Sequence, residues 1–250
     1  MRDKRSTGER FDAAATASLH SEAHRQGTDL DTLATWCSHA ERALDVAAGA
    51  GHTAGALSAH GVGRVVATDA APAMVALATR EYDVEGVVAD AERLPFGSGV
   101  FDAVTCRIAA HHFPEPAAFL AEVARVLVDG GVFAFEDNVA PDAGRLARFV
   151  DRVERRRDPT HVELVRPAVW RERFEAAGFV VDRTETVTRR LDFEAWCDRA
   201  DVTSEGRRVL RKWFADGPPG AHAALDCAFE AGTIHSFVVP KRLFRLRTRG

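Results

Sequence analysis

Short apolar segments alternate with amphipathic segments along most of this chain. Strands are predicted where apolar residues run together between turn residues, and helices where apolar residues recur every three or four positions. The predicted strands cover residues 42–46, 64–68, 86–89, 101–106, 132–135, 179–187 and 236–246, and the predicted helices 53–59, 72–81, 117–127, 145–156 and 167–177. This alternation is typical of a sheet with helices on both faces. We therefore predict an α/β fold with a doubly wound, mostly parallel sheet of seven strands.

Four segments are predicted along the chain. Residues 1–40 are expected to form a helical lid, residues 41–190 an α/β core, residues 191–232 a helical insertion on the substrate side, and residues 233–250 a C-terminal edge strand. Pro240 lies inside that last strand, and proline in a sheet favours an edge position or a break because it has no N–H to donate. The alternating Arg245 and Arg247 also suit an edge protected by charge.

The composition and net charge limit which partners and which cellular location we expect for this protein. The chain has 250 residues, 46% of them hydrophobic, and a formal net charge of −4. This balance gives no reason to expect a nucleic-acid partner. Residues 1–10 are charged and contain no apolar core of a signal peptide, and no apolar run is long enough to span a bilayer. The scattered cysteines Cys37, Cys106, Cys197 and Cys227 include no C-x-x-C pair, so we expect a cytoplasmic protein without disulfides or a metal.

A glycine turn follows the first predicted strand. Gly49 and Gly51 would let the backbone turn tightly and approach a ligand. Asp69 follows Gly49 by twenty residues, at the end of the second strand, where a carboxylate can accept hydrogen bonds from ribose hydroxyls. The combination predicts a nucleoside cofactor. The alternative is that Asp69 only caps the helix that starts at Pro72, and the two roles can coexist.

Two further acids help to distinguish a nicotinamide cofactor from a cationic cofactor without phosphates. Gly49, Gly51 and Ala54 also fit the G-x-G-x-x-A pattern of nicotinamide-dependent oxidoreductases. Asp45, however, lies at the mouth of the turn, where a carboxylate repels a pyrophosphate and attracts an ammonium group. Asp90 ends the third strand and can accept from an adenine amine. Three acids at neighbouring strand ends favour a cationic ligand without phosphates.

These residues resemble a known family in an ordered set of motifs. Residues 44–51 resemble motif I of class I S-adenosylmethionine-dependent methyltransferases. Residues 89–96, 101–107, 111–113 and 122–127 continue the resemblance to members similar to those of ubiquinone and menaquinone biosynthesis. Residues 157–162 resemble a segment of uncharacterised bacterial members. Ala47 in place of the first glycine and Asp129 in place of a proline depart from the pattern.

The resemblance implies a Rossmann-like fold and S-adenosyl-L-methionine as cofactor. It implies methyl transfer by direct in-line displacement to a small-molecule acceptor that the sequence does not identify. Asp45, Gly49 and Gly51 would surround the methionine part, Asp69 the ribose, and Asp90 the adenine. The full cofactor set that it implies is Asp45, Ala47, Gly49, Gly51, Asp69, Ala70, Met74, Asp90, Ala91 and Arg107.

Acid–base candidates are fewer, because methyl transfer from a sulfonium does not always need a base. His111 and His112 follow the fourth strand, on the side where ligands bind in open α/β sheets. His161 lies in a loop after Asp158. Each histidine could face the substrate or make only a local structural hydrogen bond. A nicotinamide-dependent oxidoreductase and a non-catalytic methyltransferase-like binding protein stay open as alternative functions.

Overall fold

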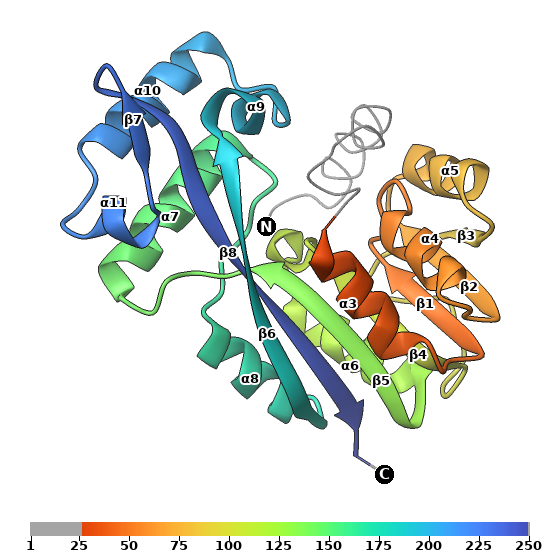
Figure 1. The fold of residues 1–250 in the computed structure, drawn as a ribbon. Coiled ribbons are helices and arrows are strands. Elements are labelled where there is room, and N and C mark those ends of the chain that lie inside the picture. The colour runs from red at the N-terminus through yellow and green to blue at the C-terminus, as the bar shows by residue number, and fades with distance from the viewer. Residues whose placement is uncertain (1–26, 250) are drawn as a thin grey trace. The chain divides into compact units, whose positions relative to one another are not determined.

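A computed structural model describes residues 27–249 (Figure 1). The first 26 residues of the predicted lid therefore lie outside the described residues. The strands are β1 Arg42–Val46, β2 Arg64–Asp69, β3 Glu85–Val88, β4 Phe101–Arg107, β5 Leu127–Asn138, β6 Phe179–Asp192, β7 Ala228–Glu230 and β8 Thr233–Thr248. The helices are α3 Thr28–Cys37, α4 His52–Ala59, α5 Pro72–Glu81, the 3₁₀ turn η1 Ala110–His112, α6 Pro116–Val126, α7 Gly144–Arg157, α8 Pro167–Ala176, α9 Phe193–Asp198, α10 Ser204–Ala215 and α11 Ala221–Ala224.

The strands of the described chain join one sheet in the order β3-β2-β1-β4-β5-β8-β6, with β7 paired to β8 outside this path. The pairs β1–β2, β1–β4, β2–β3 and β4–β5 are parallel, and β7–β8 is antiparallel. Strand order reverses between β1 and β4, which is the switch point where ligands bind in open α/β sheets. The predicted mostly parallel, doubly wound fold is confirmed.

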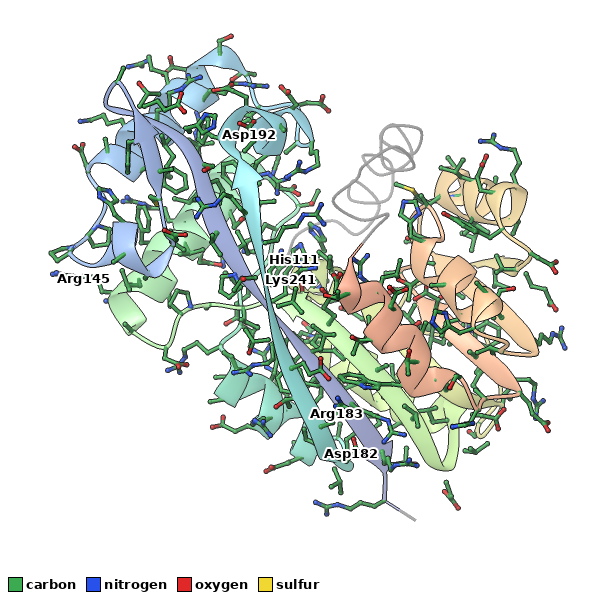
Figure 2. All side chains as sticks on the ribbon, in the orientation of Figure 1. His111, Arg145, Asp182, Arg183, Asp192 and Lys241 are labelled. Carbon is green, nitrogen blue, oxygen red and sulfur yellow. The ribbon has the colours of Figure 1, made fainter. Side chains whose placement is uncertain are left out.

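The position of β8 differs from the prediction. β8 lies between β5 and β6, so the prediction of a C-terminal edge strand is wrong. Arg245 and Arg247 do not protect a free edge but bind Asp182 of the neighbouring strand β6, at 2.7 and 3.2 Å. Asp182 is labelled in Figure 2. Pro240 still takes part through its carbonyl oxygen, which accepts from the Val139 N–H at 3.1 Å.

The start of β5 also differs from the prediction. β5 begins at Leu127, before the predicted strand at 132–135, and runs through Gly130 and Gly131. Gly130 adopts φ 71°, and the β4–β5 register shifts between Phe101 and Ala103. The glycines therefore form an irregularity inside a long strand, as left-handed residues do in bulges.

Two compact units divide the chain, and each has its own core. Of the described residues, unit 1 holds 27–137, 171–185 and 243–249. Its core includes Phe133 and Phe135 on one face of β5, with Phe174 of α8 packed edge-on against both rings. Spacing of two along the strand places both phenylalanines on the same face. This packing holds α8 against β5, the last strand in the run of parallel pairs from β3 to β5.

Unit 2 holds residues 138–170 and 186–242. Aromatic side chains of α9 and α10 meet β8 there: Trp196 and Phe214 lie 5.0 and 4.9 Å from the Phe237 ring. The charged face of α7 stays outside this core, and Arg152 stacks over Trp213. The predicted division at residues 40, 190 and 232 stays a prediction about which segments serve cofactor and substrate. No described helix has the length and apolar character required to cross a bilayer.

Candidate functional site

The carboxylate of Asp45 is the most unusual group in unit 1. Its side chain is buried within β1, and the β1–β4 register places it opposite Thr105, whose hydroxyl donates to Oδ1 at 2.7 Å. The second oxygen, Oδ2, has no hydrogen-bond partner among the described residues. Burial raises the pKa of Asp45 from 3.8 to about 7, against the opposing effect of Thr105. Such a buried oxygen is costly unless a ligand binds it.

The turn after β1 has a left-handed backbone at three positions. Ala47, Gly49 and Gly51 have φ values of 54°, 53° and 85°. A Cβ at Gly49 would have no atom within 4 Å, so this glycine borders open space. A Cβ at Gly51 would lie 2.6 Å from the Ala78 Cβ. The two positions therefore require glycine for different reasons: Gly49 leaves room beside the turn, and Gly51 lets α4 pack against α5.

Asp69 ends β2 and holds this turn in place. Its Oδ2 accepts from the Gly49 N–H at 2.9 Å, and its Oδ1 accepts from the Ala71 N–H at 2.9 Å. The second bond lies just before α5, but no described side chain caps the first turn of α5, so the alternative that Asp69 caps this helix is not supported. Because an ionised carboxylate has about four acceptor sites, these two bonds leave capacity for hydroxyl donors. Ala70 follows Asp69 at an exposed position.

Asp90 and its neighbours follow β3 at the same edge of the sheet. The Asp90 Oδ1 accepts from the Glu92 N–H at 2.9 Å, which shapes the turn, and Ala91 is buried. The strand pairing connects the three acids: Ala67 of β2 lies opposite Asp45, and Val88 of β3 lies opposite Asp69. Met74 is buried nearby in α5, in an apolar cluster with Ala50, Ala71 and Leu77. The structure thus brings the predicted set to the carboxyl ends of β1, β2 and β3.

Arg107 ends β4 between two buried carboxylates. Its guanidinium donates to Asp29 of α3 at 2.8 Å and to Glu136 of β5 at 3.0 Å. Burial disfavours the charged guanidinium, but the two carboxylates outweigh it and raise the pKa of Arg107. Sequence reasoning missed Glu136 and Thr105. Their signal is the strand register, which pairs Arg107 with Glu136 and Asp45 with Thr105.

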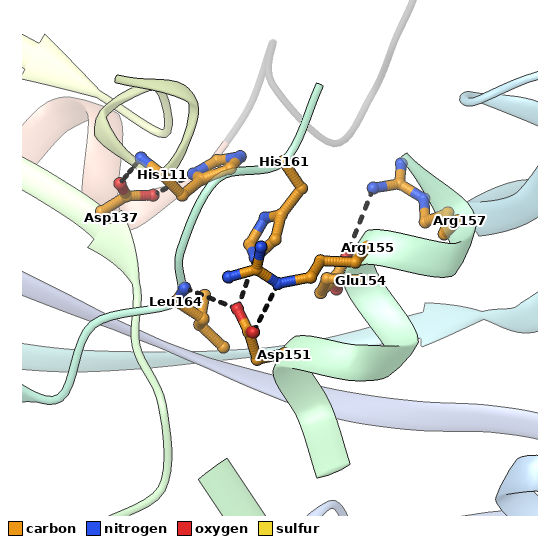
Figure 3. Close-up of polar contacts among 8 residues, drawn as sticks. All are labelled: His111, Asp137, Asp151, Glu154, Arg155, Arg157, His161 and Leu164. Carbon is orange, nitrogen blue, oxygen red and sulfur yellow. Dashed lines mark hydrogen bonds and ion pairs between the residues drawn. The ribbon is translucent and has the colours of Figure 1, made fainter. Parts of the chain in front are cut away.

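The three candidate histidines have different surroundings, and Figure 3 draws two of them, His111 and His161. In unit 1, the ring of His111 bonds the Asp137 carboxylate at 2.7 Å, and the His112 ring lies 4.2 Å from the His111 ring. In unit 2, His161 is buried, and its Nε2 lies 3.0 Å from the Asp151 Oδ1. Burial works against ionisation of Asp151, yet bonds from Arg155 and His161 lower its pKa overall. His161 thus has a clear structural role as a brace between α7 and the following loop.

Strained backbone gathers at the same strand ends. Ile108, directly after β4, has φ 53°, which is rare for a β-branched residue and costs roughly 1–3 kcal/mol. Its N–H donates to the Glu136 carbonyl at 2.8 Å, so β5 holds the strained turn in place. Together with Ala47 after β1, it places left-handed backbone at the carboxyl ends of the two strands on either side of the switch point.

Comparison with known proteins gives the same class. A methyltransferase-domain family model matches residues 44–135. The uncharacterized methyltransferase YcgJ of Bacillus subtilis (strain 168) is 35% identical over 193 residues, which cover 74% of this chain and 76% of that protein. A demethylmenaquinone methyltransferase of Clavibacter sepedonicus is 37% identical over 129 residues, which cover 50% of this chain and 52% of that one. The crystal structure of the BH2331 protein of Bacillus halodurans C-125 superimposes with a TM-score of 0.85 at 34% identity, covering 90% of this chain and all (100%) of that one.

A parallel sheet with acids at three adjacent strand ends and a bare glycine turn defines an α/β protein of the nucleoside-cofactor class. The relatives that match this chain identify one family within that class. The chain belongs to the class I S-adenosylmethionine-dependent methyltransferase family. The resemblance noted from the motifs is confirmed, and the chain is a methyltransferase enzyme. Among residues 27–249, no group of three His, Cys, Asp or Glu side chains could hold a metal ion.

Proposed function

We propose that this methyltransferase binds S-adenosyl-L-methionine at the carboxyl ends of β1, β2 and β3 and methylates a small molecule by in-line displacement. The observation that carries the proposal is the buried Asp45, whose Oδ2 has no described hydrogen-bond partner. A cationic amine on the ligand would satisfy this oxygen and favour its ionised form. The open space beside Gly49 fits a ligand that approaches the backbone closely.

The residues present fit the cofactor. Asp45 with Ala47, Gly49 and Gly51 would hold the methionine part, and Asp69 and Ala70 the ribose side. Met74, Asp90 and Ala91 would border the adenine. Arg107 would act through the two carboxylates that it binds, by balancing their charge near Asp45. The cofactor supplies an activated methyl group and a neutral thioether leaving group.

The acceptor is not identified by its surroundings, and we infer only its size class. Oxygen, nitrogen, carbon and arsenic nucleophiles are all compatible with this fold, and fold alone does not choose among them. One structural neighbour of 18% identity, a phosphoethanolamine methyltransferase from Haemonchus contortus, was solved with S-adenosylhomocysteine. The proposal includes a cytoplasmic location, supported by the four free cysteines, and no nucleic-acid partner, supported by the net charge of −4.

The nicotinamide alternative has no support in the comparisons. A pyrophosphate beside Asp45 would meet a buried carboxyl in place of a donor, which disfavours its binding. A non-catalytic binding protein would bind the cofactor yet methylate no acceptor. Turnover with any acceptor, detected as a gain of about 14 Da by mass spectrometry, excludes that alternative because only catalysis moves the methyl group.

Calorimetric titration tests the proposed cofactor site. Wild-type protein is expected to bind S-adenosylmethionine and S-adenosylhomocysteine, and Asp69→Ala to bind both at least ~100-fold more weakly, because two charge-assisted hydrogen bonds are lost. Asp83→Ala is the matched control, since Asp83 is an exposed aspartate outside the site. Thermal unfolding of Asp69→Ala checks that its turn survives. Failure of folded wild-type protein to bind either compound would refute the proposal.

A further inference from the structure

Asp137 holds His111 through two hydrogen bonds at once. The Asp137 Oδ1 lies 2.7 Å from the His111 Nδ1, and its Oδ2 accepts from the His111 backbone N–H at 2.9 Å (Figure 3). The side chain of Asp137 is 1% exposed and that of His111 is 13% exposed. A single buried carboxylate thus fixes both the backbone and the ring of His111. A histidine that only capped the loop would not need both bonds.

The pair lies at the carboxyl ends of β4 and β5 in unit 1. His111 is the middle residue of η1, three residues after the strained Ile108, and Asp137 follows Glu136 near the end of β5. β4 lies between β1 and β5, and adjacent strands are about 4.8 Å apart. The register therefore places Ala134 of β5 two strand spacings, roughly 10 Å, from Asp45, and Asp137 lies three residues, roughly another 10 Å, further along β5 towards the carboxyl edge. That is within reach of a ligand that spans the switch point.

Hydrogen-bond chemistry determines which ring nitrogen carries the proton. An ionised carboxylate can only accept, so the His111 Nδ1 must donate to Asp137. A neutral imidazole then has its lone pair on Nε2, the nitrogen that can take up a proton. The carboxylate also stabilises the imidazolium that forms when Nε2 is protonated. This is the arrangement of a general base oriented by a carboxylate.

We propose that His111, positioned by Asp137, accepts the proton that the methyl acceptor loses, and that the acceptor atom therefore carries a hydrogen as O–H, N–H or S–H. This inference rests on the proposed function. The acceptor atom forms a bond to the methyl carbon, the carbon–sulfur bond breaks, and the sulfur keeps the electron pair. The acceptor proton moves to Nε2, and the imidazolium later releases it to solvent. Thioethers, tertiary amines and halide ions have no such proton and fall outside this class.

The tautomer can be measured without any acceptor. Two-bond ¹H–¹⁵N spectra of labelled protein, with the His111 signal assigned by its loss in His111→Gln, should show a neutral ring protonated on Nδ1 at about pH 7.5. Asp137→Asn should remove this preference, because the amide can also donate. A ring protonated on Nε2 alone would overturn the proposal, since no lone pair would face the acceptor.

Matched acceptor pairs test the chemistry. The probes are catechol against 1,2-dimethoxybenzene, dimethylamine against trimethylamine, and benzenethiol against thioanisole, each with methyl-labelled S-adenosylmethionine. Transfer is expected only to the member with a transferable proton, and His111→Gln should lower kcat roughly 10²–10⁴-fold with little change in KM. Equal transfer to the aprotic members, or an unchanged kcat in His111→Gln, would overturn the proposal. If no probe is methylated, the tautomer alone decides.

Two controls separate this proposal from the proposed function. His111→Gln should bind S-adenosylhomocysteine with wild-type affinity, because the base acts on the acceptor and not on the cofactor. If the wild-type protein itself does not bind S-adenosylhomocysteine, that result contradicts the proposed cofactor site and leaves the base to be judged by the tautomer of His111. His60→Gln removes an exposed histidine whose ring bonds only the Ala56 carbonyl, at 2.9 Å, and should retain full activity. Asp137→Asn should lower kcat less than His111→Gln, and Asp137→Glu should restore part of it, because a positioning residue acts only through His111.

Discussion

Replacing Asp45 with asparagine is expected to stabilise the ligand-free protein while weakening cofactor binding. Burial raises the pKa of Asp45 to about 7 in the folded protein, against 3.8 for an ordinary aspartate, which describes the unfolded chain. The folded state therefore holds its proton more tightly. Below about pH 3.8 both states are protonated and the group has no effect, and stability is lost as pH rises through about 7.

The magnitude follows from the two pKa values. The difference between 3.8 and about 7 corresponds to about 4 kcal/mol of lost unfolding free energy once the pH exceeds both values. Asparagine has nearly the shape of the neutral acid and never ionises, so it removes this cost. At about pH 5.5 roughly 2 kcal/mol of the cost is already present, so the advantage of Asp45→Asn should grow by a further ~2 kcal/mol up to about pH 8.

Urea unfolding of wild-type and Asp45→Asn protein at both pH values measures this growth. The same curves with S-adenosylhomocysteine should show the reverse order, because a bound ligand stabilises by RT ln(1 + [L]/Kd) and the variant binds it more weakly. Asp31→Asn is a control, since Asp31 is an exposed aspartate on α3. A variant that is less stable than wild type at about pH 8 without ligand would refute the reasoning.

Two further predictions concern the turn and the ion triad. Gly51→Ala should lower the unfolding free energy by roughly 2–4 kcal/mol, because its Cβ would lie 2.6 Å from the Ala78 Cβ and its φ is 85°. Gly49→Ala should lower the unfolding free energy by only about 1 kcal/mol, because only its φ is unfavourable, and it should weaken cofactor binding. Chemical unfolding measures the stability of the two glycine variants, and calorimetry measures their cofactor binding. Equal losses of stability in the two variants would contradict the different roles of Gly49 and Gly51. Arg107→Met should destabilise by roughly 3–5 kcal/mol because two buried carboxylates lose their cation, and a thermal midpoint within a degree or so of wild type would contradict this.

The acids at the strand ends were predictable because each lies in a local motif. Asp45 and Asp69 lie at or near the ends of short, mostly apolar strands, and the carboxyl ends of parallel strands share one edge of a sheet. The sequence could not predict why position 51 requires glycine. Its requirement comes from Ala78, a residue of the next helix, and only the packing of α4 against α5 shows it.

Long-range pairing accounts for most of what the sequence did not reveal. Arg107 lies 78 residues from Asp29 and 29 residues from Glu136, so no local pattern links the three charges. The interior position of β8 depends on a crossover that places it between β5 and β6, whereas Pro240 and the alternating Arg245 and Arg247 suggested an edge. In contrast, Asp137 was visible as a polar residue after a strand, but its bond to His111 requires the turn after β4.

A crystal structure with S-adenosylhomocysteine tests the central claim most directly. The account predicts ligand density at the carboxyl ends of β1, β2 and β3, with the ribose hydroxyls within hydrogen-bond distance of the Asp69 carboxylate and the amino group next to the turn after Asp45. Density at the opposite edge of the sheet, or a bound ligand with no contact to Asp69 or to the Gly49 turn, would contradict it.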